Sequence, residues 1–400
     1  MSLQINTSKV DAAVAQNLVS LCPFHAISYE NDALSISAAC KMCRICVKKS
    51  EGVITEVQEE RAQIDKSKWV GIAVFADFTN GRLHPITMEL LGKAKELAGV
   101  TGHPVFCLLI GHHTEKACET LLSYGADRVF VYDAPVFENF RADMYANAFE
   151  DFIKNVKPSS ILVGATDLGR SLAPRVAARF KTGLTADCTV LEMETNTDLV
   201  QIRPAFGGNI MARIITPYTR PQFCTVRYKV FSKPEKVQKI IGSRIAMQLP
   251  PERAISGMTI DAITEKKAEQ DLCDAQVIVA IGRGVKSAAD RALAKELASI
   301  LQAQLACTRP LVENGWFDAK HQIGLSGRTV KPKLILTLGI SGAVQFAAGM
   351  RGSDCIIAVN SDPQAPIFDV AHYCLIGDLT EVLTSLIDRI KEAKTNAAVL

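Results

Sequence analysis

The chain has 400 residues, of which 48% are hydrophobic and 22% charged, and its formal net charge is +3. This length exceeds one ordinary hydrophobic core and predicts a globular protein of two or three domains. The near balance of charge gives no argument for a nucleic-acid partner. The uncharged, apolar run 334–350 is short for a membrane span and contains glycines, so we expect no membrane span there. The first residues lack the apolar run of a signal peptide, and we expect a cytoplasmic protein.

The first predicted domain comprises residues 1–66 and ends in a charged stretch, 56–68, that has the composition of a linker. The chain contains twelve cysteines, and eight of them are scattered singly, mostly in apolar stretches. These eight are typical of reduced core residues in a cytoplasmic protein. The other four cluster before residue 50, and this departure from scatter indicates a specific site.

The clustered cysteines are Cys22, which precedes a proline, and Cys40, Cys43 and Cys46, which follow one another at intervals of three. Thiolates spaced in this way can bind one [4Fe–4S] cluster, with the cysteine before proline as the distant ligand. The pattern resembles half of a bacterial two-cluster ferredoxin, because Ser50 stands where a ferredoxin has a further cysteine. The alternatives are a zinc site, although zinc usually takes two separated cysteine pairs, and plain core thiols without metal.

The second predicted domain, 67–255, alternates apolar runs of strand length with segments of helical periodicity. The strand candidates are 69–77, 103–111, 127–133 and 159–165, and the helix candidates between them are 85–100, 114–126 and 145–156. This alternation predicts a largely parallel sheet that helices cover on both faces. Residues 189–206 then predict a hairpin with a polar turn, and 212–231 predict two more extended segments that pair with this sheet or with a partner.

A polar, charged linker is predicted over 256–272, and the third domain follows over 273–400. Its strand candidates are 275–282, 332–339 and 354–360, and its helix candidates are 287–302, 341–349 and 379–394. The fold class is therefore α/β, with two doubly wound parallel-sheet domains and a small N-terminal ferredoxin-like α+β domain. In doubly wound folds, ligands bind beyond the C-terminal ends of the strands.

Two glycine-containing turns, 281–290 and 338–346, each follow a predicted strand and open a helix in the third domain. Glycine allows a phosphate to approach the backbone, and a helix N-terminus favours a pyrophosphate. Arg283 adds a bidentate phosphate donor. A lone turn of this kind often only connects a strand to a helix, so the combination of both turns carries the prediction of a nucleotide site.

Residues 276–381 closely resemble the FAD domain of electron transfer flavoprotein alpha subunits, and 165–228 resemble the first domain of that family. The second resemblance is carried by GRSLAPRVAARFKTGLTADC (169–188) and RPAFGGNIMARI (203–214). This resemblance implies that Arg283 reaches the FAD phosphates and that Thr308 and Arg309 lie at the isoalloxazine ring.

The resemblance implies further FAD contacts from three groups of residues. A stretch whose hydroxyl approaches flavin N5 corresponds to Gly324, Leu325 and Ser326. The turn at the pyrophosphate and ribityl chain corresponds to Ser341, Gly342, Ala343, Val344 and Gln345. The adenosine end corresponds to Asn360, Asp378 and Leu379. Two positions depart from the family pattern. Leu325 replaces a glutamine, and Phe346 replaces a histidine beside the flavin O2 edge. We expect these departures to affect the redox potential of the flavin and not the binding of FAD.

The resemblance implies a subunit that carries electrons through FAD and pairs with an electron transfer flavoprotein beta subunit. The ferredoxin-like extension resembles the forms in electron-bifurcating complexes, in which NADH reduces a second FAD on the beta subunit. One electron then goes to ferredoxin and the other to an acyl-CoA reductase or dehydrogenase, or to a lactate dehydrogenase.

Two other classes of function stay open from the residues alone. The first is an NAD-dependent enzyme. Against it, the sequence contains no strict GxGxxG motif followed by an acidic residue about 20 positions later, as a dinucleotide-binding site would require. The second is a non-catalytic iron–sulfur redox sensor. Against it, the sequence contains no DNA-binding motif and no basic face.

Overall fold

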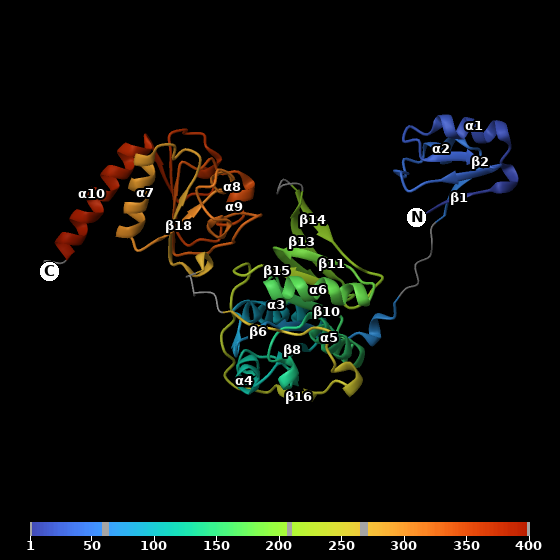
Figure 1. The fold of residues 1–400 in the computed structure, drawn as a ribbon, viewed down its shortest axis with the longest axis horizontal. Helices are drawn as coiled ribbons and strands as arrows, with labels where there is room; N and C mark the ends of the chain where they lie inside the picture. The colour runs from blue at the N-terminus through green and yellow to red at the C-terminus, as the bar shows by residue number, and fades with distance from the viewer. Residues whose placement is uncertain (1, 58–63, 206–209, 265–270, 398–400) are drawn as a thin grey trace. The chain divides into compact units, whose positions relative to one another are not determined.

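Residues 1–63 fold around a core of their own, and residues 64–400 form a second unit. The computed structural model describes residues 2–57, 64–205, 210–264 and 271–397 (Figure 1). The middle parts of both predicted linkers, 58–63 and 265–270, lie outside the described residues.

Antiparallel strand pairs and short helices make up the first unit. Its strands are β1 (Ser2–Ile5), β2 (Ile27–Glu30), β3 (Ala33–Ile36) and β4 (Ile54–Val57), and its helices are α1 (Ala12–Leu21) and α2 (Ile45–Lys49). β1 pairs with β4, and β2 forms a hairpin with β3. Leu18 of α1 and Cys46 of α2 pack with Ile27 and Ile54 in one core. The predicted small α+β domain is confirmed, but its linker begins later than predicted because Glu56 and Val57 belong to β4.

Parallel strands form the large sheet of the second unit in the order β11-β15-β10-β5-β8-β9-β16. They are β5 (Ile72–Ala76), β8 (Val105–Gly111), β9 (Arg128–Asp133), β10 (Ser160–Gly164), β11 (Leu184–Cys188), β15 (Gln222–Val226) and β16 (Ser243–Met247). Every residue of β5, β8 and β10 is buried, which is expected for central strands of a sheet covered on both faces. The order changes direction between β5 and β10, so the topological switch point lies there.

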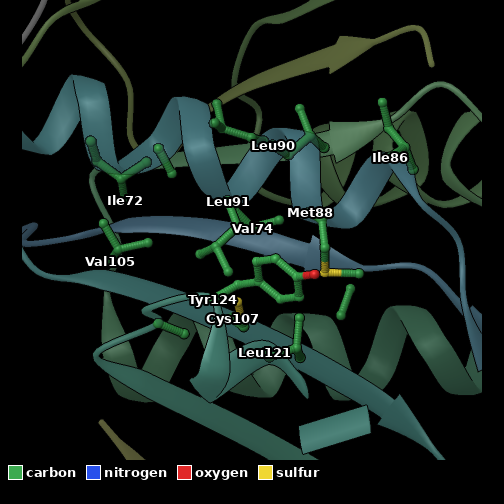
Figure 2. Packing of buried hydrophobic residues seen from close by; sticks show 14 of the residues in the cluster. Ile72, Val74, Ile86, Met88, Leu90, Leu91, Val105, Cys107, Leu121 and Tyr124 are labelled. Atoms are coloured by element: carbon green, nitrogen blue, oxygen red, sulfur yellow. The ribbon is translucent and has the colours of Figure 1, made fainter. Parts of the chain in front are cut away.

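Helices cover both faces of this sheet. They are α3 (Ile86–Thr101), α4 (Glu115–Ser123), α5 (Ala142–Val156) and α6 (Asp167–Arg179). Leu90 and Leu91 of α3 and Leu121 of α4 share one core cluster with Val74 of β5, and Figure 2 shows these side chains together around Tyr124. Residues of α5 and α6 form the core on the opposite face.

A separate antiparallel sheet follows, with the order β12-β13-β14. Its strands are β12 (Val190–Met193), β13 (Leu199–Ala205) and β14 (Ile210–Ile214). β12 and β13 are the hairpin predicted from the sequence, and β14 pairs with β13. The next predicted extended segment enters the large sheet as β15. A short pair, β6 (Phe78–Thr79) with β7 (Arg82–Leu83), precedes α3.

A second parallel sheet, with the order β18-β17-β19-β20-β21, forms the core of the C-terminal region. Its strands are β17 (Val277–Ile281), β18 (Gln304–Cys307), β19 (Leu334–Leu338), β20 (Ile356–Asn360) and β21 (Tyr373–Ile376), and its helices are α7 (Ala288–Ile300), α8 (Arg309–Glu313), α9 (Val344–Ala347) and α10 (Leu379–Ala397). α7 and α10 lie side by side against one face (Figure 1), and a different cluster packs on the other face. Both doubly wound sheets predicted from the sequence are therefore confirmed, whereas the domain boundaries at 255 and 273 stay predictions.

A buried carboxylate joins α3 to the segment after β15. Glu89 is only 6% exposed, and its Oε2 accepts the backbone N–H of Lys229 at 2.9 Å. The Lys229 ammonium in turn contacts the backbone carbonyl of Cys273, just before β17. Burial raises the pKa of Glu89 to about 7, and hydrogen bonds from the N–H groups of Lys229 and Phe231 offset only part of this rise.

This carboxylate predicts a specific pH dependence of stability. The pKa of Glu89 is higher in the folded chain than its ordinary value of 4.5. Between about pH 4.5 and pH 7, the native state therefore keeps a proton on Glu89 that the unfolded chain has lost. The stability contributed by this group is therefore full below about pH 4.5 and falls as the pH rises toward about 7. We expect Glu89→Gln to remove this fall and to be the more stable chain above pH 7 by on the order of 2 kcal/mol.

Denaturant unfolding of wild type and Glu89→Gln at about pH 5 and about pH 8 measures the effect. Lys391→Gln, which removes an exposed ion pair with Glu296, serves as the control and should shift stability equally at both pH values. A difference between wild type and Glu89→Gln that does not change with pH contradicts the prediction.

Candidate functional site

The two predicted glycine turns lie against each other at the C-terminal ends of neighbouring strands. Gly282 and Gly284 follow β17, and Gly339 follows β19, which pairs with β17 in parallel. The Gly284 N–H donates to the Gly339 carbonyl at 2.9 Å. A Cβ on Gly284 would lie 2.7 Å from the Gly339 Cα, closer than real Cβ atoms approach their neighbours. Only glycine permits this contact, and it leaves the backbone bare at the strand ends where doubly wound folds bind nucleotides.

A cavity of about 830 Å³ opens beside these turns. This volume suits a small-molecule cofactor. Most of the predicted FAD-site residues line it, namely Arg283, Thr308, Arg309, Gly324, Leu325, Ser326, Ser341, Ala343, Gln345, Phe346 and Asn360. They come from segments after four different strands, and the parallel topology brings these segments to one edge of the sheet.

Four predicted residues do not line the cavity wall. Gly342 lies behind the wall, where a Cβ would meet the Ile367 backbone nitrogen at 2.1 Å. Val344 begins α9 and is exposed. Asp378 and Leu379 lie at the start of α10, where the Asp378 carboxylate accepts the N–H of Thr380 at 2.9 Å. In this structure Gly342 and Asp378 support the local backbone, and their predicted contacts with FAD stay predictions.

Other lining residues were missed by the sequence reasoning. Arg203, Pro204 and Ala205 reach the cavity from β13, far from the other lining segments in sequence, and Gln322 and Asp362 join it from loops of the C-terminal region. The Gln322 amide donates to the Ser326 Oγ at 2.7 Å. Since Ser326 accepts this bond, its own hydroxyl hydrogen is available to donate toward a bound group.

The loop that contains Leu325 is held by an arginine from the large-sheet domain. Arg227 Nη2 donates to the Leu325 carbonyl at 2.6 Å and to the Asp187 carboxylate at 2.8 Å. Arg170 donates to the other Asp187 oxygen at 2.8 Å. Burial raises the pKa of Asp187, but the hydrogen bond and charge of Arg227, with the charge of Arg170, outweigh burial and hold this pKa below its ordinary value. Asp187 is therefore a fixed anion that orients Arg227 toward the loop.

Arg309 and Phe346 differ in how they meet the cavity. Arg309 is the first residue of α8, and its Nε donates to Glu313 one turn later at 2.8 Å, with 66% of its side chain exposed. Phe346, which replaces the family's histidine, is buried and packs with Ile340 and Ile367. The side chain at 346 therefore offers the cavity an apolar surface without a hydrogen-bond donor.

The predicted cluster cysteines lie around α2 in the first unit. Cys22 packs against the core that contains Cys46. Burial raises the pKa of the Cys46 thiol, and the neighbouring thiols of Cys40 and Cys43 raise it further. Two sulfurs receive backbone N–H groups, Cys22 from Ala26 at 3.3 Å and Cys40 from Met42 at 3.4 Å.

Among the residues that the structure describes, no three His, Cys, Asp or Glu side chains are arranged to hold one metal ion. An iron–sulfur cube makes a different demand, because each of its irons takes one thiolate and the four sulfurs stand apart. Cys22 and Cys46 pack in one small core, Cys40 and Cys43 lie near Cys46, and two of the four sulfurs have N–H donors nearby. These residues fit the donor set of such a cube. No helix within 2–57, 64–205, 210–264 or 271–397 is long and apolar enough to cross a membrane.

Comparisons with known proteins agree with this geometry. The electron transfer flavoprotein domain family matches residues 72–247, and the electron transfer flavoprotein FAD-binding domain family matches residues 271–351. A relative in Thermoanaerobacterium thermosaccharolyticum, named electron transfer flavoprotein subunit alpha, is 43% identical over 81% of this chain and 98% of its own length.

Two further relatives carry names of particular complexes. The lactate dehydrogenase (NAD(+),ferredoxin) subunit LctC of Acetobacterium woodii is 56% identical over 98% of this chain and 94% of its own length, so the match includes most of the first unit. The acryloyl-CoA reductase electron transfer subunit beta of Anaerotignum propionicum is 38% identical over 82% of this chain and 98% of its own length. The chain therefore belongs to the alpha-subunit family of electron transfer flavoproteins, with the FAD-binding domain of that family built around the two glycine turns.

Proposed function

We propose that the chain is the large subunit of an electron-bifurcating flavoprotein, in which it passes electrons between a beta-subunit flavin reduced by NADH and a dehydrogenase. The observation that carries this proposal is the cavity beside Gly284 and Gly339, because most of its lining residues lie in the segment that matches the family's FAD-binding domain. FAD accepts and releases electrons singly or in pairs, and the protein supplies its position and electrostatic surroundings.

The chain's own residues divide the work of holding FAD. The glycine turns and Arg283 receive the pyrophosphate, since the turns let a phosphate approach the backbone and Arg283 supplies a guanidinium. Thr308, Arg309 and Ser326 face the isoalloxazine ring, while Asn360, Asp378 and Leu379 hold the adenosine end. Phe346 excludes water from the ring without donating a hydrogen bond.

A [4Fe–4S] cluster on Cys22, Cys40, Cys43 and Cys46 would give this subunit a second redox centre that connects the complex with ferredoxin. Support comes from the thiol arrangement and from the name of the Acetobacterium woodii relative, which includes ferredoxin and lactate dehydrogenase. Lactate dehydrogenase is therefore the first candidate for the other electron acceptor, and an acyl-CoA reductase or dehydrogenase is the second, after the name of the Anaerotignum propionicum relative. The complex would work in the cytoplasm with its beta subunit.

The glycine contact predicts the effect of one added methyl group. Gly284→Ala forces the β17 and β19 turns apart, and overpacking of this kind costs about 1–3 kcal/mol. We expect a loss of FAD affinity of about tenfold to a hundredfold, measured as FAD per chain after dialysis. Gly352→Ala is the matched control, because a Cβ there would have only the Lys331 side chain nearby, at 3.8 Å. Full FAD retention by a folded Gly284→Ala chain would argue against a site at these turns.

The cysteine loop predicts a selective loss of iron. Cys43→Ala should lower the iron and sulfide content while FAD stays bound, because the two sites lie in different units. The complex of this variant should reduce ferredoxin poorly with NADH. Cys374→Ala, which removes an exposed thiol elsewhere, should change neither. Undiminished iron in Cys43→Ala, or about one zinc and no iron in the wild type, contradicts the cluster.

Arg309 predicts a change in the potential of the flavin. A cation beside the ring stabilises its negatively charged reduced forms, as an arginine favours the charged form of a neighbouring acid. Arg309→Ala should therefore lower the first one-electron potential, by about 60 mV for each tenfold loss of that stabilisation. Glu313→Gln provides the matched comparison, because it frees Arg309 from its ion pair and should leave the potential equal or higher. An unchanged potential in Arg309→Ala with FAD fully bound places this arginine away from the ring.

A further inference from the structure

The segment around the cluster cysteines carries a local excess of positive charge. Residues 38–50 contain four basic side chains and no acidic one. Arg44 pairs with Glu56 at 2.8 Å. Lys41, Lys48 and Lys49 are exposed, and none of them forms an ion pair with a described carboxylate. A net charge of +3 spread over the whole chain conceals this local concentration.

Large apolar side chains are exposed in the same place. Phe24 follows Cys22 by two residues, and Met42 and Ile45 lie between Cys40 and Cys46. Their exposed fractions are 44%, 37% and 36%. Because Cys22 and Cys46 share one core and Cys40 and Cys43 lie near Cys46, the residues between and beside these cysteines surround one site. We call these six residues the cysteine-loop face, which comprises Phe24, Lys41, Met42, Ile45, Lys48 and Lys49.

Exposed apolar side chains next to charged ones are a feature of protein interfaces. The small size of the cysteine-loop face fits the weak, short-lived contacts that electron carriers make. Positive rim charges accelerate the approach of a negative partner and fix its orientation. A nucleic acid would need a longer basic track with stacking aromatics, and the face offers only Phe24 of that kind.

We propose that the cysteine-loop face is the docking surface for a small acidic electron-carrier protein. This inference rests on the proposed function, because the cluster gives such a carrier a reason to dock beside Cys43, the exposed cysteine of the set. Lys41, Lys48 and Lys49 attract and orient the carrier, and Met42 with Phe24 and Ile45 excludes water from the contact.

The test measures binding, not turnover. The full chain in complex with its beta subunit is immobilised, and an acidic bacterial ferredoxin is passed over it across a series of salt concentrations. We expect the Lys41→Gln/Lys48→Gln/Lys49→Gln chain to bind about tenfold more weakly at low salt and to lose most of the salt dependence. The control is Lys116→Gln/Lys239→Gln/Lys295→Gln, which removes three exposed lysines elsewhere and should bind as the wild type does.

A second variant separates the apolar part. Met42→Gln should weaken binding also at high salt, where the charges are screened. The proposal is overturned if the wild type and the triple-lysine variant bind ferredoxin with equal affinity and equal salt dependence. It is also overturned if the control variant loses as much affinity as the triple-lysine variant. Binding of anionic lipid vesicles or single-stranded DNA that the three substitutions abolish, with ferredoxin binding unchanged, also overturns it.

Iron and sulfide analysis of the same preparations keeps the two proposals apart. A wild type without a cluster defeats the proposed iron–sulfur function, whatever the binding result. A wild type with its cluster, and a triple-lysine variant with the same iron content and undiminished ferredoxin binding, defeats the docking surface alone.

Discussion

The contact between two backbone turns is the constraint on which the FAD site depends. Gly284 and Gly339 touch because their strands are neighbours in a parallel sheet, and no side chain fits between them. Parallel topology alone would bring the strand ends together, but a Cβ on either turn would hold them apart. The absence of side chains at these points therefore does two things. It lets the Gly284 N–H bond to the Gly339 carbonyl, which closes the sheet edge, and it leaves no side chain in the way of a phosphate that approaches the turns.

Around this fixed centre, the loop expected at the flavin ring is held from outside its own sheet. Arg227 follows β15 and Asp187 lies in β11, yet they determine the position of the Leu325 carbonyl. Since Asp187 stays ionised down to a lower pH than an ordinary aspartate, this support persists throughout the neutral range. The cofactor site thus depends on both parallel sheets. The C-terminal sheet carries the loop, and residues of the large sheet hold that loop in place.

Local signals in the sequence were enough for the framework. Apolar runs such as 69–77 contain fully buried strands, here 72–76, and the glycine turns and cysteine spacing are local patterns with direct physical meaning. The contributions of Arg203 and Arg227 were not predictable in this way, because each depends on a contact between segments far apart in the chain. Val57 shows a smaller error of the same kind: its charged surroundings indicate a linker, but pairing with Ser2 makes it a strand.

The two candidate redox sites meet opposite requirements with opposite surfaces. FAD must stay bound through many turnovers, so its site is a cavity lined by backbone and fixed by buried neighbours such as Phe346 and Ile340. The proposed cluster would have to be reached by a carrier from solution, and here Cys46 packs in a small core while Cys43 is exposed in a segment with three exposed lysines. Weak charge contacts suit that task, since a carrier that docks quickly must also leave quickly. Because the cysteines lie in a unit with its own core, substitutions on the surface of that unit leave the glycine contact of the FAD-binding domain undisturbed.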